Sequence, residues 1–377
     1  MKDFLASYGL ELILLICIVC ALWVGVRSKR GFVKHVLFNL SAIFIALCIF
    51  ELVLTIGSRP QSKLDYSAPY YTTNAELGYG VGHTPFSINA TKRWVPSGKE
   101  IYSANYSFAD GRRVTPDSDS TNQQYIIFLG GSFTFGEGLN DSETLPYYYN
   151  QLYTQKRNIR NYGFHGYGTH QVYTIAKNHL ANDTSLKAAE NVEIFYWFID
   201  PHILRANGYS PWDQDSPKYI VENGILKNSG TFREVKESHV FVERLFDFIW
   251  TNSGIFNRIR ARLATRNQEV ELFFRLIKET DLLFKEQGFE FTVLVQNTSG
   301  SDPLLGRHFK DLRERVVLYL EEQGIQFISV NETILKDRND TNLLNIPGDG
   351  HPTGEFNGRL AEYLWKGRQS TRNPGND

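Results

Sequence analysis

Two long apolar runs at the start of the chain limit the folds that this sequence can adopt. Leu5 to Val26 is mostly apolar, and so is Val36 to Ile56. Each run has about the 20 residues that a helix needs to cross the hydrocarbon core of a bilayer. A cleaved signal peptide is disfavoured because no small-residue cleavage site follows Val26 and a second long run does. We expect residues 1–59 to form a two-helix transmembrane hairpin.

The distribution of positive charge predicts the side of the membrane on which the rest of the chain lies. Four basic residues stand between the two apolar runs, namely Arg27, Lys29, Arg30 and Lys34. Only Lys2 precedes the first run. Because positive loops stay in the cytoplasm, everything after the second run is expected outside it. In a bacterium the protein would sit in the cytoplasmic (inner) membrane, with its main domain facing the periplasm or the extracellular side.

The overall composition argues against several classes of protein. Lys and Arg number 40 and Asp and Glu number 41, a balance that does not favour a nucleic-acid partner. Hydrophobic residues make up 42% and charged residues 21%, as in globular proteins. The chain has 3 cysteines, and Cys17, Cys20 and Cys48 all lie near its start. The remainder therefore cannot use a thiol as nucleophile or metal ligand.

The segment after the apolar runs, residues 60–123, is rich in Tyr, Ser, Gly, Pro and Asn. Ile101–Phe108 is its one stretch with clear strand character. We expect a mostly irregular lead-in with short strands. Its many aromatic side chains indicate that it packs against another part of the protein.

Residues 124–377 alternate between strand-like and helix-like patterns. Strands are expected at Tyr125–Leu129, Ile159–Tyr162, Val192–Phe198, Phe289–Gln296 and Ile325–Val330. Helices are expected at Thr144–Lys156, Thr169–Leu180, Val270–Glu286, Gly306–Gln323 and Thr353–Trp365. A polar and aromatic insertion, residues 200–262, shows no clear period. This order predicts an α/β domain with a parallel sheet covered by helices on both faces.

Three segments near strand ends carry residues suited to acyl transfer. Ser132 lies in a glycine-rich run just after the first strand, Gly166 lies in a second such loop, and Asp349 and His351 precede the last helix. Each segment alone is more often an ordinary turn. Together they supply a nucleophile, a base that activates it and an acid that orients the base. The amides of Ser132 and Gly166 are candidate oxyanion donors.

Two other interpretations of the glycine-rich run are weaker. No Lys follows the glycines as in a phosphate-binding loop, and the glycine spacing is not that of a dinucleotide-binding loop. Histidines elsewhere lack metal-ligand spacing. We expect neither a metal nor an organic cofactor.

At these residues the sequence resembles the SGNH/GDSL hydrolase superfamily, over about Tyr125 to Trp365. The family's Gly-Asp-Ser is here Gly130-Gly131-Ser132. The resemblance implies Ser132 as nucleophile, Asp349 and His351 as its partners, and Gly166 in the oxyanion hole. It also implies a three-layer, flavodoxin-like α/β/α sandwich and ester chemistry without a cofactor.

The segment after the third strand departs from the motif that the SGNH/GDSL superfamily has there. The family normally has an Asn after the third strand, and here that strand runs into Asp200-Pro201-His202-Ile203-Leu204-Arg205. His202 is a candidate replacement donor if it points into the site, and Arg205 is a candidate partner for an anionic group. His165, beside Gly166, is a third candidate substrate contact.

These observations predict a membrane-anchored SGNH-type serine esterase that acts outside the cytoplasmic membrane. Its expected partner is an acyl ester, such as the O-acetyl groups of a surface polysaccharide or glycolipid. An O-acyltransferase of the same fold and a non-catalytic glycan-binding or scaffold subunit of an envelope assembly are the alternatives. Aromatic residues of the insertion either form a sugar-binding wall or pack on one another, namely Tyr209, Trp212, Tyr219 and Trp250.

Overall fold

The computed structural model describes residues 2–57, 62–95, 97–238, 253, 255, 267–296, 306–330, 334 and 344–372. The chain divides into two compact units. The first combines Met1–Gln61 with Val235–Leu263, and the second combines Ser62–Glu234 with Ala264–Asp377. The insertion predicted at residues 200–262 is thus divided between the two units.

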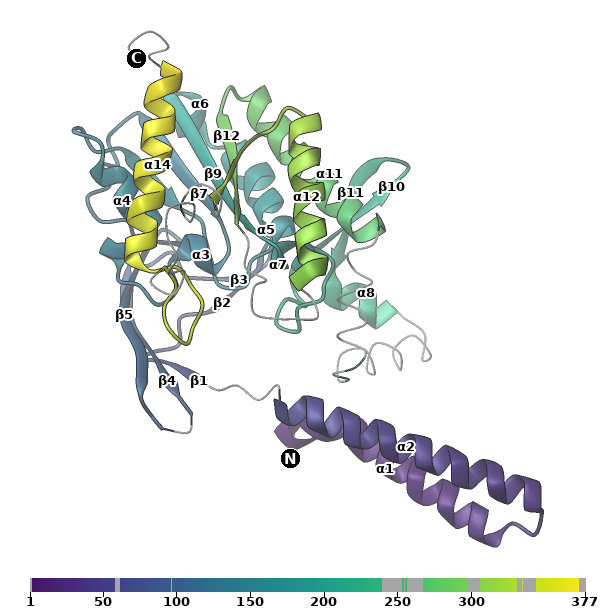
Figure 1. Cartoon of the computed structure of the whole chain (residues 1–377). Helices are drawn as coiled ribbons and strands as arrows, with labels where there is room; N and C mark the ends of the chain where they lie inside the picture. Colours follow the sequence, from purple (N-terminus) through teal and green to yellow (C-terminus); the bar gives the residue numbers. More distant parts are fainter. Residues whose placement is uncertain are drawn as a thin grey trace. The chain divides into compact units, whose positions relative to one another are not determined.

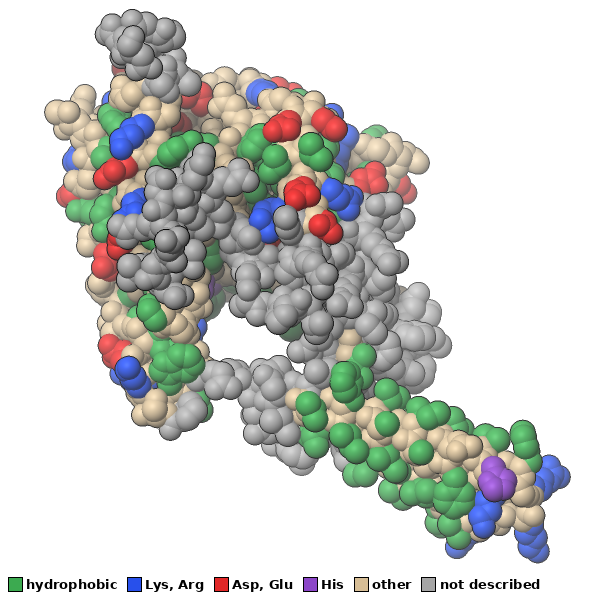
Figure 2. Space-filling view, viewed as in Figure 1, with side chains coloured by type: hydrophobic (Ala, Val, Ile, Leu, Met, Phe, Trp, Pro, Cys, Tyr) green, Lys and Arg blue, Asp and Glu red, His purple; other side chains and the backbone are tan. Residues whose placement is uncertain are grey.

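The first unit contains two long helices, α1 (Lys2–Arg27) and α2 (Gly31–Gly57), which pack side by side (Figure 1). Figure 2 shows hydrophobic side chains along both helices and Lys and Arg side chains at the end with the turn. Within the described residues one segment, Gly31–Val53, is long and apolar enough to span a membrane, and Leu14–Arg27 is apolar but shorter. A signal sequence satisfies the same criteria, so the predicted pair of spans remains a prediction.

One acidic side chain of α2 is buried inside this unit. Glu51 is 2% exposed and accepts hydrogen bonds from the Ser253 hydroxyl and the Ile255 backbone N–H. Both donors come from the insertion, about 200 residues further along the chain. This part of the insertion therefore belongs with the helices and not with the α/β domain.

The second unit is built on a nine-stranded sheet with the order β1-β4-β5-β6-β8-β7-β9-β12-β13. Its strands are β1 (Ser62–Tyr66), β4 (Phe86–Trp94), β5 (Glu100–Ala109), β6 (Arg112–Arg113), β7 (Gln124–Gly130), β8 (Asn158–Asn161), β9 (Asn191–Ile199), β12 (Glu290–Gln296) and β13 (Gln326–Ser329). Five of them, from β8 to β13 in this order, pair in parallel. Numbered along the chain, these five strands have the order 2-1-3-4-5 of flavodoxin-like folds.

The other half of the sheet corrects two expectations. Strands β1, β4, β5 and β6 pair antiparallel, so the sheet is mixed and not parallel throughout. They come from residues 60–123, so a mostly irregular lead-in is wrong for this segment. The segment joins the sheet because β5 alternates: Tyr102, Ala104, Tyr106 and Phe108 are buried, while small polar residues separate them.

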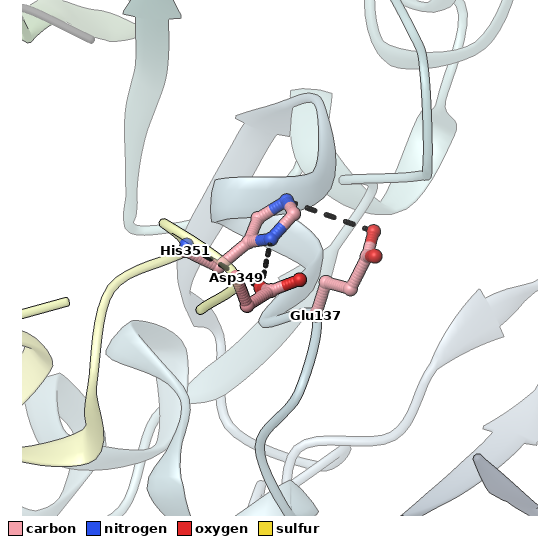
Figure 3. Close-up of side chains that lie close together, drawn as sticks. All are labelled: Glu137, Asp349 and His351. Carbon is pink, nitrogen blue, oxygen red and sulfur yellow. Dashed lines mark hydrogen bonds and ion pairs between the residues drawn. The ribbon is translucent and has the colours of Figure 1, made fainter. Parts of the chain in front are cut away.

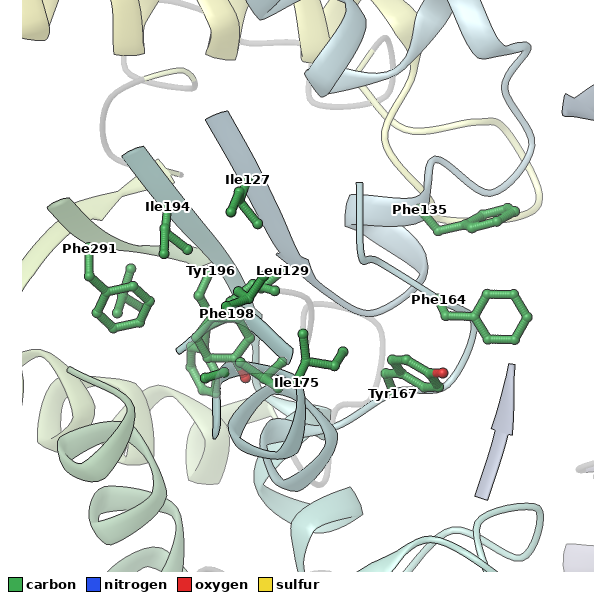
Figure 4. Packing of buried hydrophobic residues seen from close by; sticks show 14 of the residues in the cluster. Ile127, Leu129, Phe135, Phe164, Tyr167, Ile175, Ile194, Tyr196, Phe198 and Phe291 are labelled. Carbon is green, nitrogen blue, oxygen red and sulfur yellow. The ribbon is translucent and has the colours of Figure 1, made fainter. Parts of the chain in front are cut away.

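Helices cover both faces of the parallel half (Figure 1). Side chains of α5 (Thr169–Thr174), α11 (Asn267–Glu286) and α12 (Gly306–Glu322) share one hydrophobic cluster with one face of the sheet. Side chains of α4 (Leu145–Gln151) and α14 (Gly354–Arg372) share another with the opposite face. Alternate residues of β7 enter the two clusters, for example Ile127 the first (Figure 4) and Phe128 the second. The expected three-layer arrangement is present.

The described part of the insertion has structure of its own. It forms α7 (Pro201–Ala206), the hairpin β10 (Pro217–Glu222) and β11 (Ile225–Thr231), and α8 (Phe232–Ser238). Another short hairpin, β2 (Thr72–Asn74) and β3 (Gly78–Gly80), precedes the sheet's long antiparallel strands. Trp250 lies outside the described residues. Tyr219 is buried and its hydroxyl shares a hydrogen bond with Thr174, which fits internal packing.

Candidate active site

Ser132 occupies the sharp turn between β7 and a short helix, α3 (Ser132–Phe135). The turn requires glycine at Gly130, which has φ +149°, and a Cβ there would lie 2.2 Å from the Thr134 hydroxyl oxygen. The end of β8 holds the turn from the side, because Asn161 Nδ2 donates to the Thr134 carbonyl at 3.0 Å. The sequence therefore presents Ser132 at the carboxyl end of the sheet on a rigid backbone.

The structure brings together the three residues proposed for acyl transfer. Ser132 Oγ lies 2.8 Å from His351 Nε2, across 219 positions of sequence. His351 Nδ1 lies 2.5 Å from Asp349 Oδ2. The Asp349 side chain is fully buried, and Ser132 is 6% exposed. A hydroxyl, an imidazole and a carboxylate are thus connected in the order that nucleophilic catalysis requires.

The loop that carries Asp349 and His351 rests on the antiparallel half of the sheet. Lys92, on β4, donates a hydrogen bond from Nζ to Asp349 Oδ1. A Cβ on Gly348 would lie 2.4 Å from the Trp94 ring, so the loop is in close contact with β4 there. Ile346 packs in a small hydrophobic cluster with Tyr102 of β5. The segment expected to be an irregular lead-in therefore supports the loop that carries Asp349 and His351.

Burial and neighbouring charges shift the pKa values of Asp349 and His351. Burial alone would raise the pKa of Asp349, but His351 and Lys92 outweigh it and hold that pKa below its usual range. Burial alone would lower the pKa of His351, but the carboxylates of Glu137 and Asp349 outweigh it and raise that pKa. His351 is thus a stronger base than a free histidine, beside an ionised Asp349.

A second carboxylate, Glu137, reaches the same imidazole (Figure 3). Its Oε2 lies 3.6 Å from His351 Nε2 and 2.6 Å from His165 Nδ1. Burial favours the neutral acid, but attraction to both histidines holds the pKa of Glu137 well below its usual range. Glu137, Asp349 and His351 offer three potential metal-ligand atoms within 4.8 Å of one another. Hydrogen bonds to Ser132 and within the group account for this arrangement, so we assign no metal to it.

A pocket of about 540 Å³ opens beside Ser132. Its walls include three of the residues predicted for the site besides Ser132 and His351, namely Gly166, His165 and Arg205. Aromatic side chains complete it, namely Tyr71, Tyr79 and Trp212. Trp212 is 59% exposed and Tyr71 is 44% exposed, so two aromatic surfaces are accessible at this pocket. Gly166, the predicted oxyanion donor, therefore shares a pocket wall with Ser132.

Arg205 and His202, the two candidate residues after β9, have different surroundings. Arg205 lines the pocket, and its Nη1 donates to the Tyr167 carbonyl at 2.8 Å. No carboxylate among the described residues pairs with it. His202 is fully buried, shares a hydrogen bond with Tyr196 through Nδ1, and is absent from the pocket walls. A Cβ on Gly131 would lie 2.8 Å from His202 Nε2 and 3.1 Å from Arg205 Nη1. Both side chains therefore abut the residue that precedes Ser132.

Sequence reasoning did not assign a role to Glu137 or Lys92. Glu137 stands only five positions after Ser132, in the same glycine-rich run. The sequence alone could therefore have indicated that Glu137 lies near the site. Lys92 lies 257 positions from Asp349, and nothing local connects the two. Trp212 was one of four aromatic residues of the insertion proposed either for a sugar-binding wall or for internal packing, and it lines the pocket.

Comparisons with known proteins give structural matches alone. No family model matches the chain, and no curated protein matches its sequence. A lipolytic protein of the G-D-S-L family from Veillonella parvula superposes with 12% identity over 64% of this chain and 97% of its own, at a TM-score of 0.38. Acetylxylan esterases from Geobacillus stearothermophilus and Butyrivibrio proteoclasticus superpose with 13% and 10% identity, both at a TM-score of 0.34. They cover 65% and 83% of this chain, and 94% and 96% of their own chains.

The Veillonella parvula protein bears the name of the G-D-S-L family, which is the family that the motifs resemble. At such low TM-scores, the fold assignment rests on the strand order of this chain and not on the superpositions. The chemistry rests on the contacts among Ser132, His351 and Asp349.

Proposed function

We propose that the protein is a membrane-anchored serine esterase of the SGNH type that removes an acyl group from a carbohydrate ester outside the cytoplasmic membrane. The observation that carries the proposal is the chain of contacts from Ser132 Oγ to His351 Nε2 and from His351 Nδ1 to Asp349. A binding protein has no need for a buried carboxylate behind a histidine that faces a serine hydroxyl.

The reaction follows from these contacts in two balanced steps. Ser132 Oγ attacks the ester carbonyl and passes its proton to His351 Nε2, and the tetrahedral intermediate then collapses as His351 returns that proton to the leaving alcohol. Water next attacks the acyl-serine, again giving a proton to His351. The second collapse releases the carboxylic acid and returns the proton to Ser132. Asp349 keeps the imidazole oriented and stabilises its cationic form.

The oxyanion needs donors on the other side of the carbonyl carbon. The amides of Ser132 and Gly166 are two candidates, and Arg205 is the third in our proposal. Its guanidinium lines the pocket without a carboxylate partner among the described residues, and its Nη1 lies close to Gly131. A fixed positive charge there would stabilise the negative charge that develops in the transition state. It would take the place of the missing Asn after the third strand.

One observation and one expectation favour a carbohydrate as the alcohol part of the ester. Trp212 and Tyr71 present accessible aromatic rings at the pocket, and flat apolar surfaces with nearby polar groups suit sugar rings. The predicted outward orientation would bring the domain to surface glycans or glycolipids. Acetyl is the acyl group we propose to test first. A sugar hydroxyl in place of water in the second step would make the enzyme an O-acyltransferase.

The proposal is tested by incubating the full-length chain, in detergent, with acetylated oligosaccharides and measuring released acetate and transferred acetyl groups. We expect acetate release by the wild type and none above background by Ser132→Ala. A matched control is Ser229→Ala, in the hairpin strand β11, which should keep full activity. Equal acetate release by the wild type and Ser132→Ala would refute the proposal.

A further inference from the structure

The charged side chain of Glu137 is the strongest feature of the pocket that the reaction scheme does not use. It is 12% exposed and lines the pocket beside Ser132 and His351. Both of its contacts with histidine are made through one oxygen, Oε2. The other oxygen, Oε1, accepts no hydrogen bond from any described residue. A partly buried carboxylate whose second oxygen has no donor among the described residues can accept a hydrogen bond from a substrate in the adjoining pocket.

The reaction geometry says which part of the substrate meets Glu137. His351 Nε2 must come within about 3 Å of the leaving oxygen in order to protonate it. Glu137 Oε2 lies 3.6 Å from that same nitrogen. The carboxylate is therefore close to the position that the leaving oxygen must reach. A donor on the carbon next to the ester oxygen is within its reach.

Charge favours a neutral donor over a cationic one. His165 and His351 already face the carboxylate, and Lys92 also lowers the pKa of Glu137 through its charge. A further cation would be repelled by Lys92, whereas a hydroxyl would supply a donor without added charge. An alcohol without a donor would leave Oε1 desolvated and unpaired, which is costly for a charged acceptor.

We propose that Glu137 determines specificity for the leaving alcohol by accepting a hydrogen bond from a hydroxyl adjacent to the ester oxygen. This inference rests on the proposed esterase function and deepens it. The preferred substrates are then partly acylated sugars with a free neighbouring hydroxyl. Esters of simple alkanols are poor substrates.

The test compares two substrates that differ in one group. The first is a methyl glycoside with one O-acetyl group and a free hydroxyl on the next carbon, and the second carries hydrogen in place of that hydroxyl. Initial rates are measured with full-length protein in detergent at one pH. We expect the wild type to favour the hydroxyl-bearing ester by about tenfold or more in kcat/KM, the range for a hydrogen bond to a charged group.

Two variants assign the preference to Glu137. In Glu137→Met the ratio of the two kcat/KM values should fall to about two or less, because the acceptor is gone. Glu137→Gln keeps one neutral acceptor oxygen and should give an intermediate ratio. Both changes also alter the basicity of His351, but this effect is common to the two substrates and cancels in the ratio.

The outcomes separate this inference from the proposed function. A ratio near one in the wild type, or an unchanged ratio in Glu137→Met, would overturn the inference while hydrolysis itself stands. If Glu137→Met does not fold, the wild-type ratio and Glu137→Gln still decide the matter. If Ser132 fails to react with a fluorophosphonate and neither ester is cleaved, the esterase function fails, and the inference fails with it.

Discussion

Replacing Lys92 with Met tests whether the antiparallel half of the sheet takes part in the active site. Lys92 donates to Asp349 Oδ1, its side chain is 18% exposed, and that of Asp349 is fully buried. Truncating one partner of a buried charged pair costs about 2–5 kcal/mol, and the partial exposure of Lys92 places it at the lower end, about 2 kcal/mol. That loss predicts a Tm lower by roughly 4–8 °C.

The substitution should also change the pH dependence in a defined direction. His351 must be neutral to accept the proton of Ser132, so kcat/KM rises with pH through the pKa of His351. The positive charge of Lys92 lowers that pKa, so its removal raises it. In Lys92→Met the acidic limb of the profile of kcat/KM against pH is therefore expected at higher pH than in the wild type.

Two companion variants make this result specific. Lys92→Arg keeps the charge and should return the limb toward its wild-type position. Lys63→Met, on β1, removes an exposed pair with Asp65, and should change neither profile nor Tm by much. An acidic limb in Lys92→Met that stays in place or moves to lower pH would refute the reasoning.

Three further predictions follow from the pocket. Glu137→Gln removes a negative charge that raises the pKa of His351, so the acidic limb should move to lower pH, opposite to Lys92→Met; an unchanged limb would contradict this. Arg205→Met should lower kcat for an uncharged acetyl ester by about a hundredfold if its guanidinium stabilises the oxyanion, while Arg233→Met, an exposed arginine, serves as control. Trp212→Ala should raise KM for an acetylated oligosaccharide by more than for a small acetyl ester, and equal changes would remove Trp212 from sugar binding.

The parallel half of the fold could be predicted because its strands are buried on both faces. Strand β7 contains an unbroken apolar run, Tyr125 to Leu129, and such runs between helix-like segments indicate a doubly covered parallel sheet. All five strands and five helices expected after residue 124 are present, although several differ in their ends. The order of the strands follows from pairing in space and not from any local pattern.

The antiparallel half was missed for the opposite reason. In β4 the buried residues Ile88 and Ala90 are separated by the exposed polar residue Asn89, and Ala90 is small. Such an alternation is hard to distinguish from an irregular polar segment. The pairing of β4 with β5 supplies the stability that the composition does not reveal.

Some residues of the candidate site could likewise be predicted from the sequence, and others could not. Ser132, Asp349 and His351 could be proposed because each follows a strand or precedes a helix where such folds place ligands. The roles of Lys92 and Arg205 depend on contacts between distant segments. Lys92 lies in a strand that contains no recognisable catalytic motif, and its contact with Asp349 is seen only in the structure. The contact of Arg205 with the Tyr167 carbonyl depends on how the segment after β9 folds, which the sequence does not show.

The central claim, that Ser132 is a nucleophile activated by His351, is tested most directly by covalent labelling. The full-length chain would be treated with a fluorophosphonate, digested, and analysed by mass spectrometry for the modified residue. We predict one adduct on the peptide that contains Ser132, abolished in Ser132→Ala and strongly slowed in His351→Ala. A folded wild-type protein without any adduct, or with label on another serine that persists in Ser132→Ala, would contradict the account.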